Sequence, residues 1–73
     1  MKKITIKSIR LSNGYTQGTM AEAIEKSVKS NGMPDYHLTR IGYSLKERGI
    51  NDFTWAEIKA IARICDISVS KIV

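Results

Sequence analysis

The fold of this chain is decided by one stretch, which runs Gly14-Tyr15-Thr16-Gln17-Gly18-Thr19-Met20-Ala21-Glu22-Ala23-Ile24. Thr16 suits a helix N-cap, because its hydroxyl can accept a hydrogen bond from a backbone N–H of the first turn. Apolar residues then recur at spacings of three and four, which places them on one side of a helix: Met20, Ala23, Ile24 and Val28. The stretch therefore predicts an amphipathic helix that begins after Thr16 and ends near Ser30, before Asn31-Gly32.

The segment before this helix fits two structures. Ile4 and Ile6 alternate as in a strand. The spacing of Ile6, Ile9 and Arg10 instead places them on one face of a helix. The segment ends at Asn13-Gly14, where the glycine suits a left-handed helix cap. The sequence leaves the choice between strand and helix open.

A third helical segment is predicted after the break at Asn31-Gly32. Pro34 and Asp35 suit a helix start, with Asp35 as the N-cap. The segment ends at Gly49, and its apolar residues form one stripe: Leu38, Ile41 and Leu45.

The last long helix is predicted from a capping box, in which Thr54 is followed three residues later by Glu57. Residues 67–73 then fit a short turn or a final half-helix. The apolar face of the long helix consists of Ile58, Ile61, Ala62 and Cys65. We therefore expect an all-α fold, a single compact domain of four to five helices over residues 1–73.

Composition favours a polyanion as partner. Lys and Arg number 12 against 7 Asp and Glu, which gives a formal net charge of +5. Nucleic acid is the commonest partner of such a basic domain. No apolar stretch approaches the ~20 residues of a membrane span, and the basic N-terminus lacks the apolar region of a signal peptide.

Reactive side chains are scarce. Cys65 is the single cysteine and lies in an apolar run, so we expect a buried core residue rather than a reactive thiol. His37 is the only histidine, which leaves a zinc site without enough ligands. There is no Gly-rich phosphate loop. We therefore expect no enzyme activity, no metal, no cofactor and no small-molecule substrate.

Two stretches resemble the Cro/phage-repressor family of helix-turn-helix proteins, also called the xenobiotic-response-element type. The first has Arg10, then Thr16-Gln17 and Met20-Ala21, and is similar to the family's Arg-bearing helix followed by Thr-Gln-x-x-Leu-Ala. The second has Glu47-Arg48-Gly49 and then Ile61-Ala62, similar to the family's Glu-x-Gly turn and its Ile-Ala helix. Both occur in the family's order.

The resemblance implies a structural ion pair and a DNA contact. Arg10 would pair with Glu47 and tie the first helix to the end of the third. Thr16 and Gln17 would lie at a helix N-terminus, where free N–H groups and the helix dipole favour a DNA phosphate. The implied fold is a helix-turn-helix domain.

The chain departs from the family pattern in an insertion at residues 25–34. It makes the connection from Ile24 to Glu47 longer than in the family. The extra residues either lengthen the second helix or open the turn that follows it. Because that turn fixes how the recognition helix enters the major groove, the insertion bears directly on the DNA pose.

A second departure concerns the third helix. Two, six and seven positions before Glu47, where the family often has base-reading polar residues, this chain has Leu45, Ile41 and Arg40. Where the family expects core residues, it has Tyr43 and Lys46. Either the helix is rotated by about one residue relative to the family pattern, or its outer face is apolar.

The two alternatives predict different contacts. A rotated helix would bury Leu38, Ile41 and Leu45, pair Arg40 with guanine and bring polar residues to phosphate. On a rotated helix the expected DNA contacts are His37, Thr39, Arg40 and Ser44. To these the resemblance adds Thr16 and Gln17, and Lys46 and Arg48 are expected as phosphate neighbours or as surface charges. An apolar outer face would suit a protein partner, through Ile41, Tyr43 and Leu45.

Two functions therefore stay open. The first is a Cro-like transcriptional regulator that binds double-stranded operator DNA and can act as a homodimer on a palindromic site. The second is an anti-repressor that binds a phage-type repressor protein and masks its DNA-binding surface. The expected setting for either is the cytoplasm of a bacterial or phage-infected cell.

Overall fold

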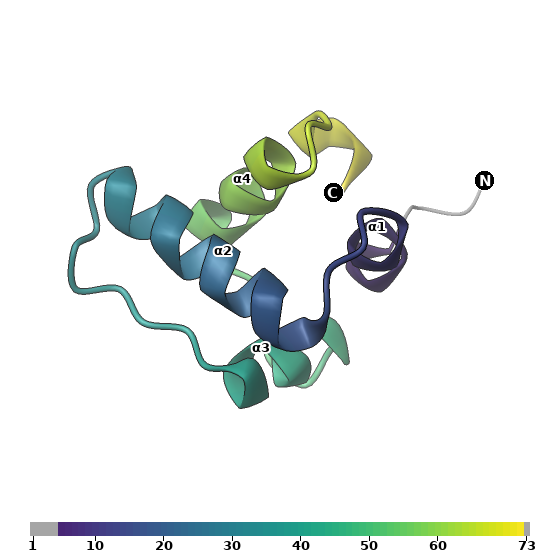
Figure 1. The fold of residues 1–73 in the computed structure, drawn as a ribbon, viewed down its shortest axis with the longest axis horizontal. Helices are drawn as coiled ribbons and strands as arrows, with labels where there is room; N and C mark the ends of the chain where they lie inside the picture. The colour runs from purple at the N-terminus through teal and green to yellow at the C-terminus, as the bar shows by residue number, and fades with distance from the viewer. Residues whose placement is uncertain (1–4, 73) are drawn as a thin grey trace.

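The computed structural model describes residues 5–72, in which four α-helices and a short 3-10 turn follow one another without a strand (Figure 1). The elements are α1 (Ile6–Ser12), α2 (Gln17–Ser30), α3 (Arg40–Glu47), α4 (Trp55–Ile64) and η1 (Val69–Lys71). The expected all-α fold is confirmed, and residues 6–12 are helical. The expectations for Ile4 and Val73 lie outside the described residues.

Threonine N-caps begin all four α-helices. In each, the threonine hydroxyl accepts a hydrogen bond from the backbone N–H three residues later. Gly14 follows α1 with φ of 75°, a left-handed conformation that glycine adopts without strain. The caps are Thr5, Thr16, Thr39 and Thr54.

The predicted helix start at Pro34 and Asp35 is wrong. Residues 31–39 are not helical, and α3 begins only at Arg40. The reason is the cap: the Thr39 hydroxyl accepts from the Gly42 N–H at 3.0 Å. Of residues 25–34, the first six continue α2 to Ser30, and the rest belong to the non-helical connection to α3.

Helix α2 lies at the centre of the molecule and packs against α3 on one side and α4 on the other (Figure 1). The radius of gyration of 11.3 Å matches the ~11 Å of a compact chain of this length. Cys65 is buried, as expected. The buried apolar side chains are Ile9, Met20, Ala21, Ile24, Val28, Leu38, Tyr43, Ala60, Ile61, Ala62 and Cys65.

The prediction that Leu38, Ile41 and Leu45 form one core stripe is wrong for Ile41. Leu38 is buried but precedes α3, whereas Ile41 is 67% exposed and Leu45 is only partly buried. Tyr43 takes the core position instead, fully buried, with its ring packed edge-on against Phe53 at 5.9 Å between centroids. The helix is therefore not rotated, and Tyr43 and Lys46 lie where the family pattern has core residues.

No helix in residues 5–72 has the length and apolar character needed to cross a membrane.

Candidate nucleic-acid interface

Glu47 fixes α3 to the two helices that precede it. The carboxylate accepts hydrogen bonds from the Arg10 side chain at 2.8 and 3.1 Å, so the expected ion pair is present. It also accepts from the Tyr43 hydroxyl at 2.6 Å and from the Gln17 amide at 3.3 Å. Both charged side chains of the pair are less than one-tenth exposed. Glu47 thus joins α1, α2 and α3 at one point.

Glu57 fixes α3 to α4 in the same way. It completes the capping box of α4 by accepting from the Thr54 backbone N–H at 2.8 Å. The same carboxylate accepts from Lys46 Nζ at 2.7 Å and from the Tyr36 hydroxyl. Glu57 is 1% exposed, so a capping residue here is also a buried ion-pair partner. Its contacts hold the residue 31–39 connection as well as α3.

A third glutamate, Glu25 on α2, holds the end of that connection. Its Oε1 accepts from the Leu38 backbone N–H and faces His37 Nδ1, both at 2.7 Å. Leu38 and His37 directly precede the Thr39 cap of α3. The residues just before α3 are therefore held by Glu25 of α2.

These contacts shift the pKa values of the carboxylates. Burial alone would raise the pKa of Glu47, but hydrogen bonds from Arg10, Tyr43 and Gln17 outweigh it and hold the pKa below the ordinary 4.5. Burial likewise opposes the bonds from Lys46 and Tyr36 at Glu57, whose pKa is also lowered. Both glutamates are therefore charged at neutral pH.

The pKa of the third carboxylate, Glu25, is also lowered, whereas the pKa values of the two bonded tyrosines are raised. The Leu38 backbone hydrogen bond lowers the pKa of Glu25. Burial, followed by the hydrogen bond to Glu47, raises the pKa of Tyr43. Burial and the contact with Glu57 raise the pKa of Tyr36. Each tyrosine hydroxyl therefore stays a hydrogen-bond donor to its carboxylate.

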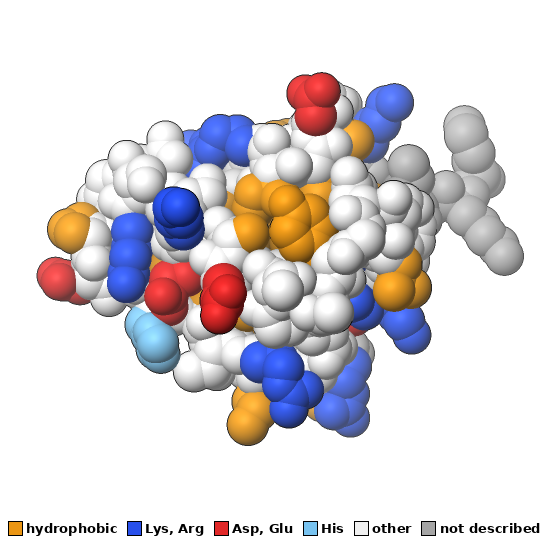
Figure 2. Space-filling model, viewed as in Figure 1, with side chains coloured by type: hydrophobic (Ala, Val, Ile, Leu, Met, Phe, Trp, Pro, Cys, Tyr) orange, Lys and Arg blue, Asp and Glu red, His pale blue; other side chains and the backbone are white. Residues whose placement is uncertain are grey.

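The opposite side of α3 has no such contacts. We call it the outer face of α3; it consists of Arg40, Ile41, Ser44, Leu45 and Arg48, which follow helical spacings of one, three and four. Arg40, Ile41 and Arg48 are exposed, and the other two are partly buried. Within residues 5–72 neither arginine forms an ion pair. Figure 2 shows basic and apolar side chains together at the edge of the molecule where α3 lies.

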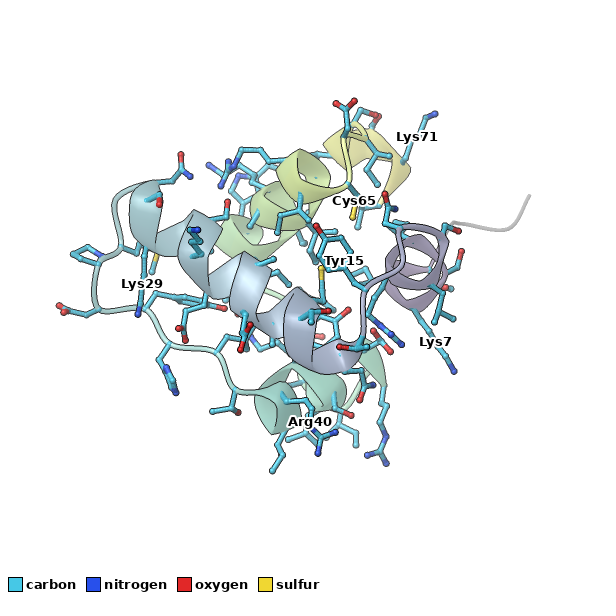
Figure 3. The ribbon with its side chains drawn as sticks, in the orientation of Figure 1. Lys7, Tyr15, Lys29, Arg40, Cys65 and Lys71 are labelled. Atoms are coloured by element: carbon cyan, nitrogen blue, oxygen red, sulfur yellow. The ribbon has the colours of Figure 1, made fainter. Side chains whose placement is uncertain are left out.

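Arg40 also lies beside the first turn of α2. A Cβ built on Gly18 would be 3.6 Å from Arg40 Cδ, so the side chain passes directly over this glycine. Figure 3 shows Arg40 at the edge of the molecule, below the N-terminal part of α2. The N-terminal turns of α2 and α3 thus adjoin each other, and the exposed Arg40 side chain lies against Gly18.

Apart from Lys46, the residues expected to bind DNA fall into three groups in the structure. Arg40, Ser44 and Arg48 lie on the outer face of α3. Thr16 and Thr39 are exposed, but their hydroxyls cap α2 and α3. The Gln17 amide bonds Glu47, and His37 lies before α3 against Glu25.

Two expected assignments need correction. Lys46 is not on the outer face, because its ammonium is 2.7 Å from the buried carboxylate of Glu57 and its side chain is only 17% exposed. Tyr43 is not available to a protein partner, because its side chain is fully buried against Phe53 and Glu47. Of the expected partner-binding residues, Ile41 is exposed and Leu45 partly so.

Sequence reasoning missed the positioning role of Glu25, Tyr36 and Glu57. Glu57 was identified only as a capping residue, and the capping-box signal gives no sign of a lysine eleven residues away. Glu25 and Tyr36 have no sequence signal, because their partners depend on how the residue 31–39 connection folds back.

No family model, curated protein or solved structure matches this chain. Residues 5–72 contain no group of side chains that could hold a metal ion. The chemistry that the outer face of α3 offers is cation–anion pairing from two arginines, together with apolar contact from Ile41 and Leu45.

Proposed function

We propose that this chain is a small transcriptional regulator that binds double-stranded DNA with the outer face of α3 in the major groove. The observation that supports it is that Arg40 and Arg48 on that face form no ion pair within residues 5–72, and that Arg40 lies beside the first turn of α2. An α-helix fits the major groove, and an arginine reads guanine or contacts phosphate there. The proposal places the protein in the cytoplasm of a bacterial or phage-infected cell, without catalytic activity or a cofactor.

The first turn of α2 supplies a second contact in this proposal. The Thr16 hydroxyl satisfies the Thr19 N–H, which leaves the N–H groups of Gln17 and Gly18 for an outside acceptor. With Arg40 alongside, a backbone phosphate would meet a helix dipole and a guanidinium together. This contact sets the position of α3 in the groove but does not read sequence.

Ile41 fits the same proposal. An exposed isoleucine is costly in water, but an apolar side chain can contact the methyl group of thymine in the major groove. Arg40 and Ile41 then supply one polar and one apolar contact from adjacent positions. A monomer of this size contacts few base pairs, so a homodimer on a palindromic site is part of the proposal.

The test is selection from a pool of random duplexes, followed by fluorescence anisotropy on the enriched sequence. We expect a preferred site containing guanine and thymine, bound with an affinity that falls steeply as salt rises from about 50 to 200 mM. No enrichment at low salt, or equal affinity for every duplex, would reject sequence-specific DNA binding.

The 67% exposure of Ile41 also favours a second candidate, an anti-repressor that covers the DNA-binding surface of another repressor. With Tyr43 buried, its apolar contact is reduced to Ile41 and Leu45. Size-exclusion chromatography with a purified repressor encoded by a neighbouring gene distinguishes the two candidates. Co-elution with the repressor, together with no enriched duplex, favours the anti-repressor. Enrichment of a DNA site by this protein without any partner counts against the anti-repressor.

A further inference from the structure

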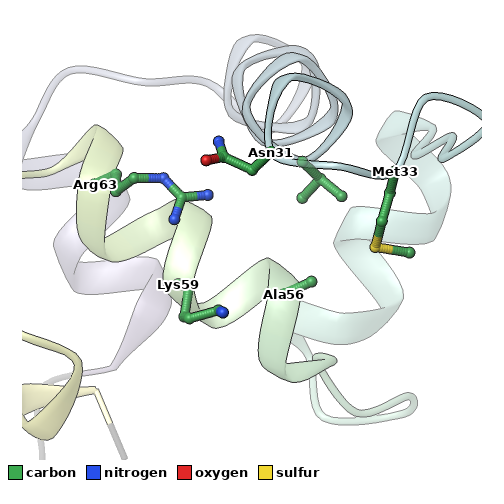
Figure 4. A pocket seen from close by; sticks show the side chains of 6 residues that line it. Asn31, Met33, Ala56, Lys59 and Arg63 are labelled. Carbon is green, nitrogen blue, oxygen red and sulfur yellow. The ribbon is translucent and has the colours of Figure 1, made fainter.

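A second surface, which shares no residue with the outer face of α3, lies between the end of α2 and α4. A cavity of about 150 Å³ opens there to solvent (Figure 4). Val28, Met33 and Ala56 supply its apolar lining, and no carboxylate is among its lining residues in the described chain. Asn31, Lys59 and Arg63 complete the lining, and we call this cavity the α2–α4 cleft.

The cationic rim of the cleft continues along α4. Trp55, Lys59 and Arg63 are all exposed and four residues apart, so they lie in one row on the helix. The Arg63 guanidinium is held in place by Ser27 Oγ, at 3.1 and 3.3 Å. Trp55 is 58% exposed and Met33 47% exposed. The α2–α4 cleft is therefore bordered by two cations and by Met33, and Trp55 lies one helical turn before Lys59 in the same row.

The size of the cleft indicates the kind of occupant. Sites for free small molecules are typically ~300–1,000 Å³, well above this volume. A cavity of ~150 Å³ accepts a group as large as benzene, which is the size of one leucine or phenylalanine side chain. Trp, Met and Arg are also the residue types enriched in protein interfaces.

We propose that the α2–α4 cleft and the α4 row form a docking surface for an acidic protein segment that inserts one large apolar side chain. The apolar side chain fills the space between Val28, Met33 and Ala56. Carboxylates on either side of it pair with Lys59 and Arg63, and the segment covers Trp55. Because none of the residues that line the cleft belongs to the outer face of α3, the regulator can hold this segment while that face is on DNA.

The probe is a synthetic peptide, acetyl-Asp-Glu-Leu-Glu-Asp-amide, followed by the fluorescence of Trp55 and by amide shifts in NMR spectra. Trp55 is the only tryptophan in the chain, so its emission reports on this surface alone. We expect a shift of the emission to shorter wavelength and amide shifts confined to residues around the cleft. A peptide with Ser in place of Leu, and one with Lys in place of each acid, should produce neither.

Three variants test the geometry. Ala56→Leu fills the cleft from within and should weaken peptide binding by about tenfold, because the anchor loses its place. Lys59→Gln combined with Arg63→Gln should weaken it by a similar factor and abolish its salt dependence. Lys7→Gln removes a charge from α1, away from α4 in Figure 3, and is the matched control that should leave binding unchanged. The Gln pair keeps the test valid if Ala56→Leu does not fold.

Several results would overturn the proposal. If the Ser peptide binds as tightly as the Leu peptide, no apolar side chain is inserted into the cleft. If the amide shifts are centred on α3, the peptide binds at a different surface. If a DNA duplex gives the same amide shifts at Lys59 and Arg63, the row is a nucleic-acid surface instead. The cleft variants should retain full affinity for the selected duplex, so failure of this proposal is distinguishable from failure of DNA binding.

Discussion

The two faces of α3 are built in opposite ways. On the inner face, Tyr43, Lys46 and Glu47 are each bonded to a partner from another part of the chain or to one another. On the outer face, Arg40, Ile41 and Arg48 are exposed to solvent. The inner face thus holds the helix, and the outer face is free to contact another molecule.

The contrast reverses the usual distribution of residue types. The side that faces the protein contains a lysine and a glutamate, and the side that faces solvent contains an isoleucine. Buried charges are tolerated because each finds an opposite charge and further hydrogen bonds. No buried side-chain nitrogen or oxygen in the described residues lacks a partner. Residue type alone therefore does not tell which side of such a helix is buried.

The largest predicted effect comes from breaking the inner face. Glu47→Ala leaves the buried guanidinium of Arg10 without its carboxylate and removes the acceptor of the Tyr43 hydroxyl. Loss of one partner of a buried ion pair costs about 3–5 kcal/mol. We expect this decrease in the free energy of unfolding, measured by urea denaturation followed by circular dichroism.

The matched control is Glu22→Ala, which removes an exposed carboxylate from α2. Its free energy of unfolding should change by no more than about 0.5 kcal/mol. If both variants unfold at the same urea concentration as the wild type, the Glu47 contacts do not stabilise α3, and the contrast between the faces is lost.

Acid should lower the stability of the protein less than Glu47→Ala does, because a protonated carboxyl keeps its volume and part of its hydrogen bonding. The pKa values of Glu25, Glu47 and Glu57 are lower in the folded chain than the ordinary 4.5. The unfolded chain therefore binds more protons, so stability is present above pH ~4.5 and is lost as the pH falls through the folded values. Thermal unfolding between about pH 7 and 2 measures this.

The alkaline side has the opposite sign. The pKa of Tyr43 is raised above its ordinary 10.0. Stability from this hydroxyl is therefore complete below pH ~10 and is lost as the pH rises towards the folded value.

The variant Glu47→Gln tests the acid side of the same profile. It should flatten the loss of stability at acid pH, and an unchanged loss in that variant would show that Glu47 does not titrate below its ordinary pKa.

The helices were largely predictable from sequence, because their signals are local. Thr16 and Thr54 cap helices by bonding residues three positions away, and the spacing of Met20, Ile24 and Val28 follows from one helix. The start and register of α3 were not predictable in this way. Leu38 and Ile41 have the spacing of a core stripe, but the Thr39 cap falls between them and starts the helix after Leu38.

The candidate site was predictable only in part. The Arg10–Glu47 pair agrees with the expectation from the family resemblance. The partly buried position of Lys46 depends on Glu57, which a sequence pattern identifies only as a capping residue. Long-range partners of this kind are set by tertiary packing rather than by spacing along the chain.

The outer face is tested next, by comparing two arginines. Arg40→Ala should lower affinity for the selected duplex by about 1–3 kcal/mol, because one guanine contact is lost. Arg63→Ala removes an exposed arginine from α4 and should leave that affinity unchanged. Fluorescence anisotropy at fixed salt measures both. Equal losses of affinity in the two variants would mean that DNA binding depends on the total positive charge of the protein and not on the outer face of α3.

The smallest effect on stability should come from Ile41→Ser, and it gives the sharpest test of the two faces. Ile41 is 67% exposed, so little apolar burial is lost, and serine and isoleucine have similar helix propensities. The free energy of unfolding should stay within about 0.5 kcal/mol of the wild type. Tyr43→Ser, two residues away on the inner face, should cost several times more.

Binding separates the proposed uses of Ile41. If it contacts a thymine methyl, sites selected by Ile41→Ser should lose their preference for thymine at one position and keep the rest of the sequence. If it anchors a partner repressor, the same variant should lose co-elution instead. A clear loss of stability in Ile41→Ser would contradict both uses, because the isoleucine would then belong to the core and α3 would present a different face to solvent.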